Sequence, residues 1–167
     1  MTDTPRQILA VGRSYAAHAE ELGNVPQTQA PLLFWKPPGC LARDGVCNLP
    51  RWPEGPTRID YEGEIVIVIG KEGRRIPEPE AHKYVAGLTI MNEGSVRDYL
   101  RHAKFNVTQG KNFAKSGALG PWMVAADELD PMSELRVMTR VNGEKRQDDT
   151  TESLMFPFRY QIGRAHV

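Results

Sequence analysis

The chain has 167 residues, of which 40% are hydrophobic and 25% are charged, and its 21 basic side chains balance its 21 acidic ones. This composition is typical of a globular domain with enough length to bury a core. The balanced charge gives no field that would attract nucleic acid or an anionic membrane. The longest apolar run, Ile65–Ile69, is too short to span a bilayer. We therefore expect no nucleic-acid partner and no membrane association.

The N-terminal residues lack the apolar segment of a secretory signal peptide. The two cysteines, Cys40 and Cys47, have a spacing that matches no zinc or redox motif. We therefore expect a cytoplasmic protein whose two thiols remain free, as is usual in a reducing compartment.

The first part of the chain predicts short elements separated by glycine and proline. Ile8–Val11 favours a strand, and residues 14–22 have the apolar spacing of a helix stopped by Gly23. The proline- and glycine-rich stretch 26–56 holds large apolar residues, so we expect ordered loop and short strand there. Residues 61–69 are rich in β-branched side chains and predict the clearest strand.

The second part of the chain also predicts short helices and strands joined by turns. We expect a helical turn at 79–84, a strand at 85–91, a helix at 96–104 and a strand at 122–125. Asn142-Gly143 separates two further strand segments, 135–141 and 144–147, and this dipeptide is a strong signal for a two-residue β-hairpin. The elements predict a β-rich α+β fold with a few short helices, and no composition change marks a second domain.

Two glutamates lead into the clearest strand. In extended chain, Glu62 and Glu64 point to the same face, roughly 6–7 Å apart along the strand. Two adjacent carboxylates repel unless one takes a proton or a cation neutralises both. Oxygen ligands without cysteine favour a hard ion, Mg2+ or Mn2+. On spacing alone, however, two solvated glutamates on an exposed strand face are the commoner arrangement.

Further charged residues follow the next predicted strands. Glu93 lies at the end of the 85–91 strand and offers a third carboxylate if the two strands pair. Lys111 and Arg97 could balance negative charge that develops on a substrate oxygen. Taken one at a time, both cations are more often surface charges.

On the predicted N-terminal helix, His18 and Glu21 are three residues apart and therefore neighbours on the helix surface. A carboxylate beside an imidazole fixes its tautomer and raises its basicity, which suits a general base acting through water. The alternative is that His18 is a packing residue, because it shares a helix face with Tyr15 and Leu22. A helix of about nine residues is marginal by itself, so it could order over a substrate as a lid.

Eight segments, in order along the chain, resemble the fumarylacetoacetate hydrolase family. They are 12–23 (GRSYAAHAEELG), 34–38 (FWKPP), 60–64 (DYEGE), 85–87 (VAG), 92–98 (NEGSVRD), 110–113 (GKNF), 119–122 (LGPW) and 141–144 (VNGE). The resemblance covers residues 8 to about 160. It is nearest to bacterial members described as 2-hydroxyhepta-2,4-diene-1,7-dioate isomerases or hydratases of aromatic catabolism.

The resemblance implies a mixed β-sandwich roll of the fumarylacetoacetase C-terminal-domain type, with Mg2+ or Mn2+ as cofactor. The implied metal ligands are Glu62, Glu64 and Glu93, and the implied catalytic residues are His18, Glu21, Lys111 and Arg97. The chain departs from the family pattern at two positions. Glu93 stands where the family more often has aspartate, and Leu100 stands where it often has glutamine.

The function implied by the resemblance is that of a metal-dependent enzyme acting on a small 2-oxo or enol acid. The reaction would be C–C bond hydrolysis of an acylpyruvate-like substrate, or isomerisation or decarboxylation, through a metal-stabilised enolate. The alternatives are a non-catalytic ligand-binding homologue and an inactive fragment.

Family members continue past the region of Phe156 by a third to a half of this chain's length. We therefore expect residues 1–161 to be a single catalytic domain that is incomplete at its C-terminus, and the full-length protein to be a homodimer. The last residues, 162–167, match one translated frame of a common sequencing adapter, so we expect them to be an artefactual tail.

Overall fold

The computed structural model describes residues 5–21, 23, 29–42, 45–48, 58–101 and 107–164. The residues divide by their contacts into two compact units. Unit 1 comprises residues 1–10, 34–66 and 89–123, and unit 2 comprises residues 11–33, 67–88 and 124–167. The chain therefore passes from one unit to the other several times along its sequence.

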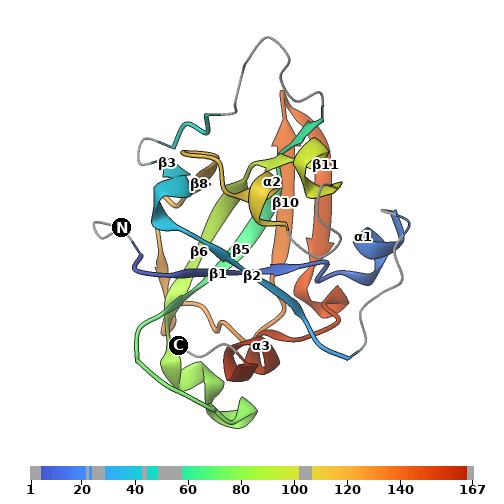
Figure 1. Cartoon of the computed structure of the whole chain (residues 1–167). Coiled ribbons are helices and arrows are strands. Elements are labelled where there is room, and N and C mark those ends of the chain that lie inside the picture. Colours follow the sequence, from blue (N-terminus) through green and yellow to red (C-terminus); the bar gives the residue numbers. More distant parts are fainter. Residues whose placement is uncertain are drawn as a thin grey trace. The chain divides into compact units, whose positions relative to one another are not determined.

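A mixed sheet positions the acidic residues. Its strand order is β3-β8-β6-β5, and β9 also pairs with β6 (Figure 1). The strands are β3 (Leu41–Ala42), β5 (Gly63–Ile69), β6 (Val85–Glu93), β8 (Gly117–Leu119) and β9 (Val124–Ala125). β8 runs parallel to β3 and antiparallel to β6. The β-branched run predicted at 61–69 thus becomes β5, next to the strand that ends at Glu93.

The other described strands form two-stranded sheets. These are β1 (Ile8–Gly12) with β2 (Leu32–Lys36), β4 (Ile59–Asp60) with β7 (Ser95–Val96), and β10 (Arg136–Val141) with β11 (Glu144–Thr150). The predicted hairpin is confirmed: Asn142 and Gly143 have φ of 52° and 86°, as a two-residue turn with two left-handed positions requires. The strand predicted at Ile8–Val11 is confirmed as well.

The described helices are short. They are α1 (Ala16–Glu21), α2 (Thr108–Lys111) and α3 (Phe158–Arg164), with 3-10 turns η1 (Pro38–Cys40), η2 (Glu78–Tyr84), η3 (Arg97–Arg101) and η4 (Thr151–Ser153). The helical turn predicted at 79–84 is confirmed as η2. A β-rich fold with few helices is therefore what the chain forms.

Several predicted boundaries are wrong because distant segments compete for the backbone. The predicted helix 14–22 begins only at Ala16, since the Ser14 carbonyl accepts a hydrogen bond from Met155 N–H and Tyr15 forms a β-bridge with Leu154. The predicted helix 96–104 is wrong at its start, because Val96 pairs with Ile59. Its residues 102–104 lie outside the described part of the chain.

Other boundaries shift for the same reason. β5 begins at Gly63 rather than residue 61, and β6 continues to Glu93 because it pairs with β8. The strand predicted at 122–125 is reduced to β9, Val124–Ala125. No element was predicted for α2, β8 or α3.

The two units differ in what they bury. In unit 2, Ile76, Ala81, Val85 and Ile162 form an apolar core against which further hydrophobic side chains pack. In unit 1, the buried residues include apolar ones such as Met91 and Val96, but also the charged residues Lys36, Glu93 and Lys111. Burying charge is costly unless the charges are paired, so the interior of unit 1 calls for a functional explanation.

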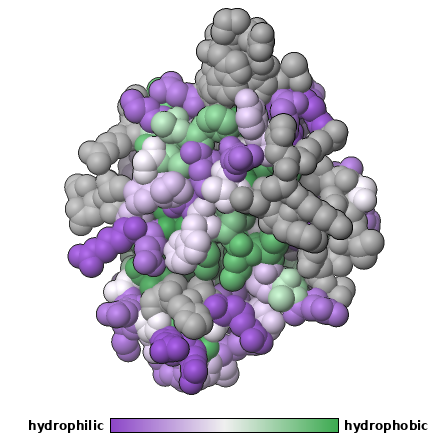
Figure 2. Space-filling view, viewed as in Figure 1, coloured by the Kyte–Doolittle hydropathy of each residue, from purple (hydrophilic) through white to green (hydrophobic). Residues whose placement is uncertain are grey.

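Some large hydrophobic side chains remain at the surface. Trp35, Ile90 and Trp122 are each more than half exposed, and apolar groups lie between hydrophilic ones on the face drawn in Figure 2. Among the described helices, none has the length and apolar character needed to cross a membrane.

Candidate metal centre

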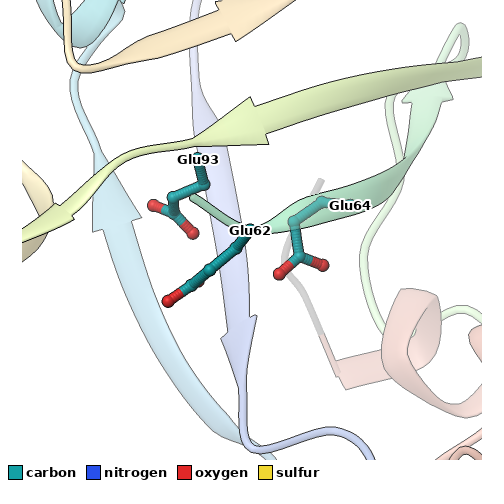
Figure 3. A group of neighbouring side chains, drawn as sticks. All are labelled: Glu62, Glu64 and Glu93. Carbon is teal, nitrogen blue, oxygen red and sulfur yellow. The ribbon is translucent and has the colours of Figure 1, made fainter. Parts of the chain in front are cut away.

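Three glutamates converge in unit 1. Glu62 immediately precedes β5, Glu64 is the second residue of β5, and Glu93 is the last residue of β6. Each offers a carboxylate oxygen within 4.8 Å of the others, and Figure 3 shows the three side chains close together where β5 and β6 lie side by side. We call these residues the carboxylate cluster.

Backbone pairing fixes the spacing of the cluster. The N–H of Glu93 donates to the carbonyl oxygen of Glu62 at 2.8 Å, which ties the end of β6 to the start of β5. On its other side, Glu93 pairs with Gly117 of β8. Glu93 is only 4% exposed, so its carboxylate is held in the interior by strands on both sides.

Glu62 is the carboxylate with the most partners. Its Oε1 accepts hydrogen bonds from Arg97 Nη2 at 2.7 Å and Ser95 Oγ at 2.8 Å, and its Oε2 accepts one from Lys111 Nζ. Burial alone would raise the pKa of Glu62, but Lys111, then Arg97 and Ser95, outweigh burial and lower this pKa below its ordinary value. Glu62 is therefore a carboxylate anion at neutral pH.

Glu64 has the opposite environment. Its side chain has no hydrogen bond or ion pair within the described part of the chain. Burial, followed by the negative charges of Glu62 and Glu93, raises the pKa of Glu64 to about 8, against a smaller opposing effect of Lys111. At neutral pH the cluster thus holds a proton on Glu64 unless a further cation replaces it.

Lys111 reaches the cluster from α2. Its ammonium contacts Glu62 and lies 3.5 Å from Glu93 Oε2, with the side chain 9% exposed. Gly110 permits this position, because a Cβ there would lie 2.7 Å from the Val96 carbonyl oxygen. Lys111 is thus a buried counter-ion, and the alternative of a surface charge does not describe it.

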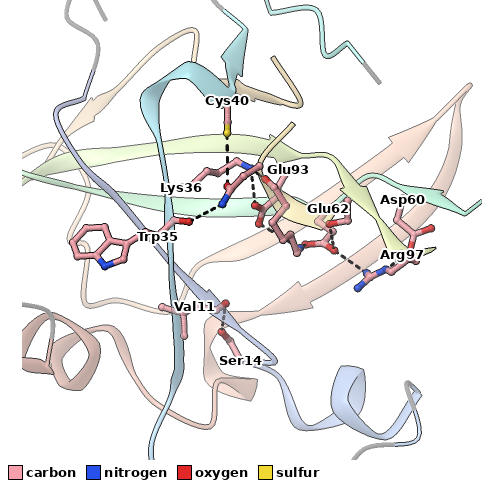
Figure 4. Close-up of polar contacts among 12 residues, drawn as sticks. Val11, Ser14, Trp35, Lys36, Cys40, Asp60, Glu62, Glu93 and Arg97 are labelled. Atoms are coloured by element: carbon pink, nitrogen blue, oxygen red, sulfur yellow. Dashed lines mark hydrogen bonds and ion pairs between the residues drawn. The ribbon is translucent and has the colours of Figure 1, made fainter. Parts of the chain in front are cut away.

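Arg97 is also drawn inward. Besides Glu62, its guanidinium contacts Asp60, with Nε 2.6 Å from Asp60 Oδ2. Figure 4 shows Arg97 between the two acidic side chains. Arg97 therefore holds Glu62 in place.

Lys36 belongs to the same site, although no sequence pattern predicted it as a site residue. Its Nζ lies 3.1 Å from Glu93 Oε1 and donates a hydrogen bond to the Lys111 carbonyl oxygen. Alternation along β2 places Phe34 and Lys36 on one face, but only the fold brings that face to Lys111, whose Nζ lies 5.8 Å from the Phe34 ring centroid.

His18 and Glu21 lie on α1, in unit 2. His18 Nδ1 is 3.7 Å from Glu21 Oε2, and the two side chains are 43% and 77% exposed. The buried residue of this helix is Ala19, not His18. The interpretation of His18 as a core packing residue therefore does not fit its exposure.

The carboxylate cluster fits a hard divalent ion by its chemistry. All its donors are carboxylate oxygens, the ligand type that Mg2+ and Mn2+ prefer. Glu93 Oε1 forms an ion pair with Lys36, whereas Glu64 has no ion pair within the described residues. The ligand set thus includes one carboxylate, Glu64, without a paired cation, which a bound metal ion would supply.

The family model described as fumarylacetoacetate (FAA) hydrolase C-terminal matches residues 7–166. The chain therefore belongs to the fumarylacetoacetate hydrolase family, and its fold class is the β-rich, mixed-sheet fold of that C-terminal domain. Both the family and the fold class predicted from the sequence are confirmed.

Two relatives show the sequence identity of the match and the share of each protein that it covers. The chain is 38% identical over 152 residues to an uncharacterized protein of Archaeoglobus fulgidus, which covers 91% of this chain and 58% of the relative. It is 36% identical over 155 residues to the 4-hydroxyphenylacetate degradation bifunctional isomerase/decarboxylase of Salmonella dublin, covering 93% of this chain and 35% of that protein. The chain thus spans about a third to little more than half of these relatives.

A solved structure is similar over nearly the whole chain. It is the crystal structure of fumarylpyruvate hydrolase from Pseudomonas aeruginosa in complex with Mn2+ and pyruvate, which superimposes with a TM-score of 0.82 at 29% identity. The match covers 95% of this chain and 70% of that one. Relatives with named activities are thus enzymes, which does not favour a non-catalytic homologue.

Proposed function

We propose that this protein is a divalent-metal-dependent enzyme that acts on a small 2-oxo or enol acid, with Mg2+ or Mn2+ held by Glu62, Glu64 and Glu93. One observation carries the proposal: three carboxylates converge within 4.8 Å, and one of them, the partly buried Glu64, has no ion pair within the described residues. A hydrolase of the same family that was crystallised with Mn2+ and pyruvate supports the choice of metal and substrate class.

The metal would supply Lewis-acid chemistry, polarising the 2-oxo and carboxylate oxygens of the substrate. The chain supplies the remaining charges. Lys111, whose ammonium already lies against Glu62 and Glu93, stabilises negative charge that develops on the substrate oxygen. Arg97 orients Glu62 through its contact with Oε1 and adds positive charge at the same edge of the cluster.

His18 and Glu21 form the acid–base pair of the proposal. Glu21 lies on the Nδ1 side of the imidazole, at 3.7 Å, and can hold the tautomer that leaves Nε2 as the proton acceptor. The partly exposed ring can reach water, so His18 would activate water for C–C hydrolysis or move a proton for isomerisation.

The substrate class is a 2-oxo acid with a second carbonyl or an enol. Cleavage of a C–C bond in an acylpyruvate-like substrate and isomerisation of an enol acid both place negative charge on the 2-oxo oxygen. The family relatives support both branches, since one is an isomerase/decarboxylase and the other a hydrolase by name. The proposal therefore covers hydrolysis, isomerisation and decarboxylation.

The test is metal-dependent turnover of the purified protein on a panel of acylpyruvates and oxaloacetate, with and without Mn2+ or Mg2+. Glu64→Ala should abolish metal-dependent turnover, because it removes the carboxylate that needs the cation most. Glu72→Ala is the matched control, since Glu72 is exposed and outside the cluster. Metal-dependent turnover that survives Glu64→Ala would refute the metal assignment.

A further inference from the structure

Lys36 is the largest fully buried side chain within the described residues, at 2% exposure. It ends β2, whose alternating pattern LLFWK turns Phe34 and Lys36 to one face and Trp35 to the other. A buried ammonium is costly to desolvate, and an apolar side chain of similar size often serves packing as well or better. The charge of Lys36 therefore needs a reason beyond filling space.

Its contacts join two parts of the site. On one side, Lys36 Nζ forms an ion pair with Glu93 Oε1 at 3.1 Å. On the other side, it donates a hydrogen bond to the carbonyl oxygen of Lys111, the last residue of α2. Carbonyl groups at a helix C-terminus lack intrahelical partners, and a cation is a favourable one.

The ion pair with Lys36 gives the two carboxylate oxygens of Glu93 different partners. Oε1 faces Lys36, while Oε2 lies 3.5 Å from Lys111 Nζ, on the side where Glu62 is also bound. Figure 4 shows Lys36 beside Glu93, away from the Arg97 end of the network. One ammonium thus contacts both a carboxylate oxygen of Glu93 and the backbone of Lys111.

We propose that Lys36 is a positioning residue of the metal centre, holding Glu93 so that Oε2 is presented to the cation and anchoring the backbone that carries Lys111. This inference rests on the proposed function, because it assigns a role to Lys36 only if the carboxylate cluster binds a divalent ion. In this role Lys36 acts through Glu93 and the backbone of Lys111, not by direct contact with the cation or the substrate.

A positioning role and a purely electrostatic role of Lys36 predict opposite changes in metal affinity when the ammonium is removed. An ammonium beside a metal ligand repels a cation, so removing it should strengthen metal binding if charge were its only influence. If Lys36 positions Glu93, removing it should weaken binding, as losing a partner that orients a metal ligand does. The direction of the change therefore separates the two roles.

The experiment is a Mn2+ titration of the purified protein, with free Mn2+ measured by electron paramagnetic resonance. Lys36→Met should raise the Mn2+ dissociation constant by about 10-fold or more. Lys36→Gln, which keeps N–H donors but loses the charge, should lie between Lys36→Met and the unchanged protein. Lys115→Met is the matched control, because Lys115 is an exposed lysine near the same helix, and it should leave the dissociation constant unchanged.

A second readout distinguishes positioning from loss of folding. The spectrum of bound Mn2+ at saturating protein should change in Lys36→Met and not in Lys115→Met, because the orientation of Glu93 alters the ligand field. Unchanged or tighter Mn2+ binding by Lys36→Met, or weaker binding with an unchanged spectrum, would overturn the inference. If Lys36→Met does not fold by circular dichroism, Lys36→Gln decides by the same two criteria. If the unchanged protein binds no Mn2+, the proposed function fails instead.

Discussion

The carboxylate cluster of unit 1 and the β10–β11 hairpin of unit 2 both carry networks of acidic and basic side chains, but they differ in burial and in charge balance. On the hairpin, Asp148 accepts hydrogen bonds from Arg136 on both of its oxygens and from Lys145 on one. These partners, the hydrogen bond from Arg136 first, lower the pKa of Asp148 below its ordinary value.

In the cluster, by contrast, one partly buried carboxylate has no hydrogen bond or ion pair within the described residues. Glu62 has three partners and Glu64 has no ion pair within the described residues, so their pKa values move in opposite directions. Neighbouring groups whose pKa values are separated by their environment are typical of functional sites. A count of ion pairs would rate the hairpin as highly as the cluster, whereas burial combined with charge imbalance identifies the cluster.

The largest expected effect is that of Glu64→Gln on the pH dependence of stability in the metal-free protein. In the folded state the pKa of Glu64 is raised to about 8, from 4.5 ordinarily. Between these values the folded protein holds a proton that the unfolded chain has lost, so stability falls as pH rises through this window. The free energy of unfolding decreases by roughly 4–5 kcal/mol by pH 8, and Glu64→Gln should remove most of this decrease.

Urea unfolding in the presence of a chelator, at pH values near 4.5 and above 8, measures this effect. Glu72→Gln is the control, because Glu72 is exposed and should show the pH dependence of the unchanged protein. Equal stability of Glu64→Gln and the unchanged protein at alkaline pH would mean that Glu64 is not buried beside the other two carboxylates.

The next effect in size is on catalysis. Lys111→Met removes the ammonium that contacts Glu62 and Glu93, and turnover should fall by about 100- to 1,000-fold, as for other groups that stabilise developing charge. Lys115→Met should have little effect. Steady-state kinetics at saturating metal measures both variants. A change in KM with an unchanged kcat in Lys111→Met would contradict a role in the chemical step.

His18→Ala tests whether the exposed pair on α1 takes part in catalysis. Turnover should fall by at least about 100-fold, the usual contribution of a general base, while Mn2+ affinity stays unchanged because His18 is not among the proposed ligands. Kinetics and a parallel Mn2+ titration separate the two quantities. Full activity of His18→Ala would leave the pair without a catalytic role.

The smallest effect is expected on the hairpin. Asp148→Asn removes a well-paired but solvent-accessible charge, and such pairs add little to stability. Mn2+ affinity and turnover should not change, and the melting temperature should decrease only slightly. A large loss of activity in this variant would show that the hairpin contributes to function and would break the contrast with the cluster.

Part of this site could be predicted from the sequence. Strand alternation placed Glu62 and Glu64 on one face, and the end of the next strand placed Glu93 beside them once β5 and β6 paired. These are local patterns joined by one pairing, which is why sequence reasoning could find them. The family resemblance supplied the same three residues.

The rest depended on contacts between distant segments. Lys36 lies 57 positions before Glu93 and 75 before Lys111, and its selection required knowing that β2 ends beside both. The start of α1 depended on the bridge between Tyr15 and Leu154. The four-residue helix α2 contains Gly110 and has too few residues for an apolar period, so nothing in its local sequence indicated a helix.

The most direct test of the central claim is an isothermal titration of the metal-free protein with Mn2+, at a pH near 8 where Glu64 begins to ionise. The unchanged protein and Glu72→Gln should each bind one Mn2+ per chain, and binding should release protons as Glu64 loses its own. Glu64→Gln should weaken binding by more than about 100-fold, beyond the range of changes that affect only the partners of metal ligands. Equal binding by Glu64→Gln and the unchanged protein would contradict a metal centre built on the carboxylate cluster.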